Sequence, residues 1–331
     1  MTLRIAVALE DASFAAADWI DAVRQADRAR LDFVTFDDRF GRQGPDAVLV
    51  AARVAPLTRH VGLIPVATTT HTEPFHLSTS LATLDHVSRG RAGWQVRVSA
   101  DPAEAALLGR REPLGADELL AEAADAVEVV RRLWDSWEDD AIIKDVATGR
   151  FIDRDKLHYI DFDGTYFSVK GPSIVPRPPQ GQPVVAALTH GPQAWERLDV
   201  DVYFVTPADV SSAAGFVRRI PAGKLVFADI VAFLDADQEA AIRRRGATTS
   251  DAAVFAGTPA ELADLIAGWQ PAGIAGIRLR PGGPGDLATI TADLVPELRR
   301  RGLFEPSTAT TLRERLGLPA AVNRYQEAAR A

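Results

Sequence analysis

Short apolar runs alternate with longer amphipathic segments along the whole chain. This alternation is typical of parallel strands that are joined by crossover helices. The clearest step is residues 74–98, in which a helical pattern stops at Gly90 and a buried strand follows at once. The pattern predicts eight strands, at residues 3–9, 33–37, 61–67, 92–98, 183–188, 202–205, 225–234 and 276–279. We therefore expect the α/β class and one (β/α)8 barrel.

Helical spacing of apolar positions predicts helices between these strands, at residues 17–30, 46–57 and 117–137. Acidic residues lead the first turn of the last of these, where the helix macrodipole favours them. A further helix should open at Pro259, with Thr258 as its cap and Glu261 at the capping-box position.

Residues 138–181 break this rhythm between the fourth helix and the fifth strand. We expect an insertion here, within one domain of residues 1–331, and a C-terminal tail over 305–331 that packs on a partner subunit. Asp163 and Gly164 form a good tight-turn pair between two short alternating segments. The insertion is therefore predicted to hold a hairpin with strands at 158–162 and 165–169.

Composition narrows the class of protein. The chain has no cysteine, which excludes disulfides, thiolate metal sites and cysteine nucleophiles and fits a reducing compartment. A net charge of -8 opposes attraction to nucleic acid or to anionic lipid. The sequence starts without a signal-like segment, and no apolar stretch reaches the ~18 residues of a membrane span. A cytoplasmic protein that binds neither nucleic acid nor membrane is the expectation.

Ligands of such barrels bind at the carboxyl ends of the strands. The polar residues just beyond the predicted strands are Asp37, Asp38, Arg39, Thr68, Thr69, Thr70, His71, Arg97, Ser99, Thr189, His190, Gly191 and Arg280. Hydroxyls, glycines and arginines in this number suit a phosphorylated cofactor. Polar strand ends also occur in any barrel because they face water, so only the set as a whole points to a ligand.

Several of these residues have alternative interpretations. Asp37 and Asp38 could act as a general-base pair or bind a metal, but no further carboxylate or histidine has ligand spacing, so we predict no metal site. His76 and His86 fall on a predicted helix, where packing or surface roles are expected. His71 follows its strand directly and is better placed to contact a ligand.

Residues 84–94, LDHVSRGRAGW, resemble the signature of the bacterial luciferase-like flavin monooxygenases, in the branch of the nitrilotriacetate and dibenzothiophene-sulfone monooxygenases. Residues 295–304 and 310–319 are similar to the C-terminal tail of that branch. The resemblance implies a monooxygenase that inserts one oxygen atom from O2 into a small organic substrate. It also implies reduced FMN supplied by a separate flavin reductase. This chain carries no G-x-G-x-x-G turn for a nicotinamide of its own.

The resemblance and the strand ends together give a candidate site. Family members carry an acidic residue after the second strand that contacts flavin, and Asp38 matches it. Gln95 stands where the family usually has asparagine. We predict catalytic roles for His71, Gln95 and His190, and cofactor binding by Asp38, Thr68, Thr69, Thr189, His190, Gly191 and Arg280.

The chain departs from the family at other positions. The family's His-Asp-Glu-Arg-Tyr segment reads Ala-Asp-Glu-Leu-Leu at residues 116–120, and its Gln-Ala-Gly-x-Ser loop after strand five is replaced by a Thr189-His190-Gly191 segment. Three interpretations stay open: an active FMN-dependent monooxygenase, a catalytically degenerate partner subunit of a larger homologue, and an F420-dependent oxidoreductase. Family analogy suggests a homodimer or heterodimer through helices two and three, whose small residues are Ala47, Ala51, Ala52, Ser78 and Ala82.

Overall fold

The computed structural model describes residues 2–191 and 196–328. Eight parallel strands form a closed barrel, in which each strand pairs with its neighbours and β10 pairs with β11 to complete the ring. In order around the barrel the strands are β1 (Arg4–Leu9), β2 (Phe33–Phe36), β3 (Gly62–Thr68), β4 (Gly93–Arg97), β9 (Val184–Thr189), β10 (Val202–Val205), β11 (Leu225–Leu234) and β13 (Gly276–Pro281). The predicted barrel is confirmed, and each predicted strand end lies within two residues of the observed one.

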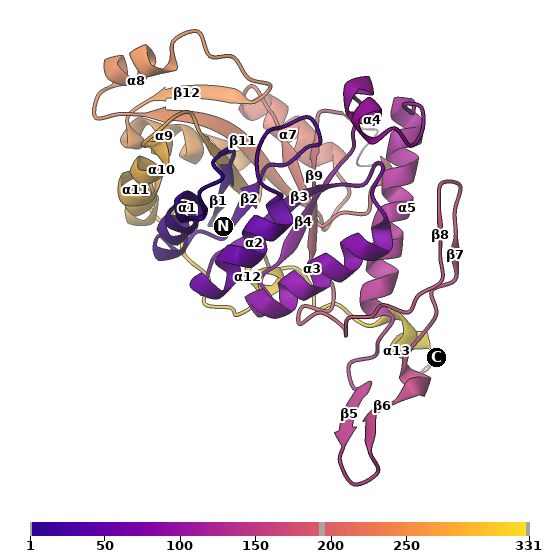
Figure 1. The fold of residues 1–331 in the computed structure, drawn as a ribbon. Helices are drawn as coiled ribbons and strands as arrows, with labels where there is room; N and C mark the ends of the chain where they lie inside the picture. The colour runs from indigo at the N-terminus through magenta and orange to yellow at the C-terminus, as the bar shows by residue number, and fades with distance from the viewer. Residues whose placement is uncertain (1, 192–195, 329–331) are drawn as a thin grey trace.

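Helices surround the barrel (Figure 1). The predicted ones are α1 (Ala16–Arg28), α2 (Ala47–Val54) with a 3-10 turn (Ala55–Leu57), α3 (Pro74–Ser88), α5 (Ala116–Asp135) and α9 (Pro259–Trp269). Thr258 caps α9 as predicted, because its hydroxyl accepts the Glu261 N–H at 3.2 Å while the Glu261 carboxylate accepts the Thr258 N–H at 2.8 Å. At the end of α3, Arg89 adopts the left-handed conformation together with Gly90.

The structure contains further helices that the pattern of apolar residues did not predict. They are α4 (Pro102–Leu108), α7 (Val210–Arg219), α8 (Gln238–Arg245), and the short α12 (Leu312–Arg315) and α13 (Arg324–Ala328). In addition, α10 (Asp286–Thr289), a π-helix (Ile290–Leu294) and α11 (Val295–Arg300) follow one another without a break. An additional strand, β12 (Ala253–Gly257), pairs with the last five residues of β11 beyond the ring.

Hydrophobic residues pack in two shells. The larger cluster lies between the strands and the helices, and the smaller one fills the barrel interior with Phe33, Phe204 and Phe227 at its centre. Leu312 and Leu316 of the C-terminal tail belong to this inner cluster and are fully buried. The tail thus closes the amino-terminal end of its own barrel.

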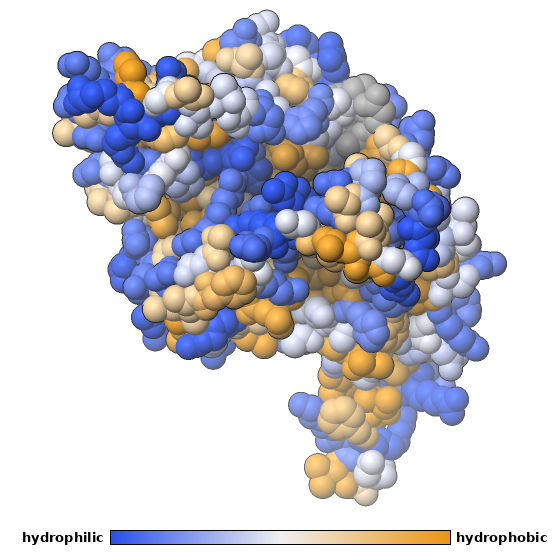
Figure 2. All heavy atoms as spheres, turned by 45° about the horizontal axis from the view of Figure 1, so that its top comes forward, coloured by the Kyte–Doolittle hydropathy of each residue, from blue (hydrophilic) through white to orange (hydrophobic). Residues whose placement is uncertain are grey.

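Residues 138–181 hold two hairpins. Strands β7 (Phe162–Asp163) and β8 (Ser168–Val169) form the predicted one, but Asp163 pairs with Ser168, so the turn comprises residues 164–167 and the strands are shorter than expected. The second hairpin, β5 (Ile142–Asp145) with β6 (Arg150–Ile152), was not predicted. It projects from the barrel (Figure 1), and hydrophobic side chains gather on this projection (Figure 2). Val146 and Phe151 are exposed on it.

No described helix is both long enough and apolar enough to cross a membrane.

Candidate active site at the barrel mouth

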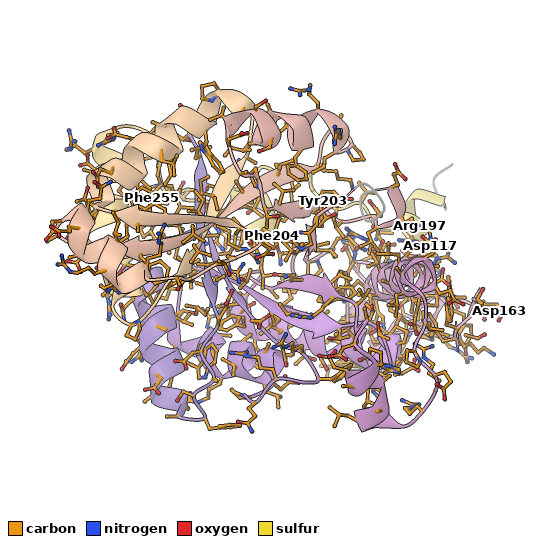
Figure 3. The ribbon with its side chains drawn as sticks, turned by 90° about the horizontal axis from the view of Figure 1, so that it is seen from above. Asp117, Asp163, Arg197, Tyr203, Phe204 and Phe255 are labelled. Carbon is orange, nitrogen blue, oxygen red and sulfur yellow. The ribbon has the colours of Figure 1, made fainter. Side chains whose placement is uncertain are left out.

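A buried polar layer lies inside the barrel just below its carboxyl end. Arg278 of β13 donates from Nε to Asp229 of β11 at 2.8 Å, and from Nη1 to the Oε1 atom of Gln95 at 2.8 Å. Its guanidinium lies 3.8 Å from the ring centroid of Phe204, which occupies the centre of the barrel in the view from above (Figure 3). Gln95 therefore faces the interior, while the Trp94 indole donates to the Ala67 carbonyl and packs in the outer shell. The side-chain amide of Gln95, for which we predicted a catalytic role, thus accepts a hydrogen bond from Arg278.

One side of the mouth is hollowed. Asp38 and Thr68 line a groove of about 510 Å³ that also contacts Phe40 and extends between α2 and α3 to His76. Asp38 accepts the Ala47 N–H at 2.9 Å and so ties the loop after β2 to the start of α2. Burial raises the pKa of Asp38, although that hydrogen bond opposes the rise. The structure thus brings two predicted cofactor residues, Asp38 and Thr68, to one groove.

The next strand end is held together by internal hydrogen bonds. The Thr69 hydroxyl donates to the Arg97 carbonyl at 3.1 Å, so it serves the chain's own backbone. His71 has a left-handed backbone with φ 65°, and its ring lies 6.4 Å from that of Phe40. Burial and the positive charge of Arg111 lower the pKa of His71, which keeps the imidazole neutral at pH 7. Its Nδ1 is buried and has no hydrogen-bond partner within the part of the chain that the structure describes.

The opposite side of the mouth carries a chain of ion pairs. Arg280 binds Glu10 through Nε at 2.8 Å and Asp251 through Nη1 at 3.0 Å. Asp251 also lies 3.6 Å from Nε2 of His190, whose Nδ1 is 3.1 Å from the Thr206 hydroxyl. Two predicted residues, Arg280 and His190, therefore meet here, and both are engaged by side chains of this protein.

Thr189 and Gly191 form a small closed turn beside them. The Thr189 hydroxyl donates to the Gly191 carbonyl at 2.8 Å, and the same hydroxyl oxygen accepts the Gly191 N–H at 3.3 Å. On the other flank, Leu119 at the start of α5 is buried. Arg197 lies beside Asp117 (Figure 3), 3.2 Å from its carboxylate, and so links α5 to the segment that precedes β10.

Sequence reasoning did not identify three polar residues of the mouth: Asp229, Asp251 and Glu104. Asp229 lies in the middle of an apolar strand, where its single charge was a signal that could have been used. Asp251 and Glu104 gave no such signal, because Asp251 ends a polar run and Glu104 lies in a short segment outside the predicted elements, so only the fold places them at the mouth. Within the described residues, no group of three or more potential metal ligands occurs.

The chain belongs to the luciferase-like monooxygenase family, whose model matches residues 1–228. It is 32% identical to one of the subunits of pristinamycin IIA synthase from Streptomyces pristinaespiralis, over 92% of this chain and 90% of that protein. It is 29% identical to the N-acetyl-S-(2-succino)cysteine monooxygenase of Bacillus subtilis, over 92% of this chain and 88% of the relative.

Identity is 34% to component A of nitrilotriacetate monooxygenase from Aminobacter aminovorans, but that match covers 61% of this chain and only 50% of the relative. The fold matches solved structures over nearly the whole chain. Long-chain alkane monooxygenase superposes with a TM-score of 0.87 at 21% identity over 96% of both chains. Riboflavin lyase, solved with a modified FMN and riboflavin, also gives 0.87, at 22% identity over 97% of both chains. At these identities the two structures show the shared fold.

Proposed function

We propose that this protein is the oxygenating component of a two-component, FMN-dependent monooxygenase. The reaction would take a substrate R–H, O2 and reduced FMN to R–OH, water and oxidised FMN, with a separate flavin reductase supplying the reduced cofactor. Its family membership and the monooxygenase names of its relatives support this class of reaction. The bound flavin would supply the activation of oxygen, and the protein would hold, orient and shield the reactants.

The single observation that carries the proposal is the groove that Asp38 and Thr68 share at the mouth. Its volume of about 510 Å³ falls within the range of cofactor pockets, roughly 300–1,000 Å³. Polar groups on its rim, among them the exposed Arg39, alternate with apolar walls such as Val66 and Leu77. That mixture fits a flat aromatic ring with a charged phosphate tail, so the residues present suit FMN.

The residues around the groove would have distinct roles. Asp38 and Thr68 would hydrogen-bond the cofactor, and Arg39 would pair with its phosphate. His71, neutral and with a free buried ring nitrogen in the described structure, could orient the substrate or transfer a proton there. Gln95 and Arg278 would form a fixed polar floor, while His190 and Arg280 would contribute only if a ligand displaced Asp251.

Titration with oxidised FMN, and with reduced FMN under anaerobic conditions, tests the proposal. We expect saturable binding that weakens by about tenfold or more in Asp38→Ala and less in Thr68→Val, as expected for lost hydrogen bonds to charged and neutral groups. Thr83→Val is the matched control, because Thr83 lies exposed on α3 and bonds only within that helix. Absence of binding by the wild-type chain, or equal weakening in the control, would contradict the proposal.

A second function is favoured by one observation. The match to one subunit of pristinamycin IIA synthase covers both chains almost completely, and it is accompanied by a 29% identical match to another subunit of the same synthase. The chain could therefore act as the partner of a longer homologue and leave cofactor binding to it. Co-purification with such a homologue, together with no FMN binding by this chain alone, would favour that function.

A further inference from the structure

The most unusual carboxylate near the mouth is that of Glu104, on the short helix α4. Glu104 is 8% exposed. Its Oε1 accepts the backbone N–H of Gly41 at 3.1 Å, and its Oε2 accepts the hydroxyl of Ser99 at 2.6 Å. A carboxylate buried to this extent is costly unless hydrogen bonds compensate it, and here both of its oxygens are used.

The two donors come from different loops. Gly41 lies in the loop after β2, which also carries Asp38, Arg39 and Phe40, and Ser99 lies in the loop after β4. The Ser99 N–H in turn donates to the Thr70 hydroxyl at 3.0 Å, which adds the loop after β3. Glu104 therefore ties together the ends of three neighbouring strands.

The loop after β2 depends on this connection. Apart from Glu104, Arg97 is the side chain from outside the loop that hydrogen-bonds to it within the described structure, and it binds the Asp37 carboxylate at 3.0 Å and the Asp38 carbonyl at 3.2 Å. The loop's own Arg42 donates to the carbonyls of Glu10 and Asp11 after β1. Position 41 is also built for close approach, because a β-carbon there would lie 3.2 Å from Oε1 of Glu104. Arg97 holds the start of the loop, and Glu104 holds it at Gly41, directly after Phe40.

We propose that Glu104 is a positioning residue that holds the loop of residues 37–46 closed over the groove and so fixes the place of Asp38, Arg39 and Phe40. The consequence for FMN rests on the proposed function above. Without the Glu104 carboxylate the loop loses its anchor at Gly41, and the neighbouring groove side chains lose their fixed positions. Cofactor affinity then falls through loop disorder, since Glu104 itself lies behind the loop.

Hydrogen exchange of the flavin-free protein tests the anchor directly. We expect exchange of residues 37–44 to rise by about tenfold or more in Glu104→Ala, the loss expected for hydrogen bonds to a charged group. Glu104→Gln should restore most of the protection, because its amide oxygen can still accept the Gly41 N–H and the Ser99 hydroxyl can accept from its NH2 group. Leu107→Ala, an exposed position on the same helix, is the matched control. Ser99→Ala gives an intermediate case if Glu104→Ala does not fold.

FMN titration of the same variants completes the test. The proposal predicts weaker binding in Glu104→Ala, by about tenfold, with recovery in Glu104→Gln. Unchanged exchange at residues 37–44 in a folded Glu104→Ala protein would overturn the proposal, as would faster exchange with unchanged FMN affinity. Faster exchange in a protein whose wild type binds no FMN would support the anchor and refute the proposed cofactor, so the two failures are distinguishable.

Discussion

Among single residues, the pair formed by Arg278 and Asp229 is the most deeply buried pair of charges in the barrel. Asp229 is fully buried and Arg278 is 4% exposed. Such a pair survives in a low-dielectric interior only because each charge compensates the other and the remaining donors are hydrogen-bonded. Gln95 completes that set, which explains why a glutamine lies buried in the middle of β4.

Removing one member of this pair should therefore be costly. We expect Asp229→Ala to lower the free energy of unfolding by about 3–5 kcal/mol, because it leaves the Arg278 guanidinium uncompensated. Glu239→Ala is the control, since it removes an exposed i,i+4 pair with Arg243, worth about 0.3–0.5 kcal/mol. Urea denaturation of both variants measures the difference. A loss below about 1 kcal/mol in Asp229→Ala would contradict the compensation argument.

His60 gives the chain a pH dependence at the closed end of the barrel. Burial, and the charges of Arg315 and Arg30, lower the pKa of His60 to about 4. The unfolded chain, with the ordinary value near 6.5, then binds a proton that the folded chain does not, so stability falls as pH drops from about 6.5 towards about 4.

Replacing His60 should flatten this part of the stability curve. We expect the loss of unfolding free energy between pH 7 and pH 5 to be smaller in His60→Gln than in the wild type, as measured by chemical denaturation at both pH values. Comparison of the two proteins cancels the contributions of buried acids such as Asp32, whose pKa is raised to about 6 mainly by burial. If the unfolding free energy changes equally with pH in the two proteins, His60 is not held neutral in the folded chain.

At the scale of elements, the C-terminal tail acts as the floor of the barrel. Leu312 is fully buried against the first residues of β2 and β3, and a β-carbon at Gly62 would lie 2.7 Å from its Cδ1 atom. The glycine at the start of β3 is therefore required by a leucine of the C-terminal tail, far away in the sequence.

A pair of substitutions tests this packing. Leu312→Ala should cost about 2–5 kcal/mol through lost burial and the cavity that it leaves. Gly62→Ala should cost less in the Leu312→Ala background than in the wild type, because the cavity accommodates the new methyl group. A double-mutant cycle by urea denaturation measures the coupling. If the losses of unfolding free energy of the two single variants simply add up in the double variant, Leu312 does not restrict the side chain at position 62.

Which elements could be predicted follows from where their apolar residues lie. The eight barrel strands are buried on both faces and read as continuous apolar runs, so their position needed no knowledge of the fold. Helix α4 and strand β12 are short and owe their burial to distant partners, as Glu104 does to Gly41, so local pattern could not define them. The hairpin β5–β6 has exposed apolar residues on a projecting arm, which no core-based pattern describes.

For the whole molecule, closure of the parallel barrel brings all carboxyl strand ends to one mouth, and this made the list of candidate residues predictable. Which of these residues bind one another within the mouth was not predictable, because the binding partners lie far apart in the chain, as Glu10 and Arg280 do. The sequence therefore predicted that Arg280 would reach the mouth, and the structure shows that Glu10 and Asp251 bind it there.

The structure also bears on how a second chain could pack against this one. Of the small residues expected to admit a partner helix, Ala47, Ala51, Ser78 and Ala82 are buried within this chain, so they serve its own packing. The large hydrophobic residue of α2 that remains exposed is Leu49, whose side chain is 70% exposed and lines the outer end of the groove. A partner that docks on α2 and α3 would cover Leu49 and close the groove from outside.

A dimer through this face predicts a specific sensitivity. Leu49→Glu would place a charge in the interface and should convert a dimer to a monomer without a change in melting temperature of the isolated fold, since the position is exposed in the single chain. Ile242→Glu on α8 is the control, because Ile242 is also an exposed hydrophobic residue, at 45%, and α8 lies away from α2 and α3 (Figure 1). Light scattering coupled to size-exclusion chromatography measures the mass of each variant. A wild-type monomer at micromolar concentration would exclude the dimer. Dissociation by the control as well would contradict an interface on α2 and α3. In either case the groove would be open to solvent on its outer side.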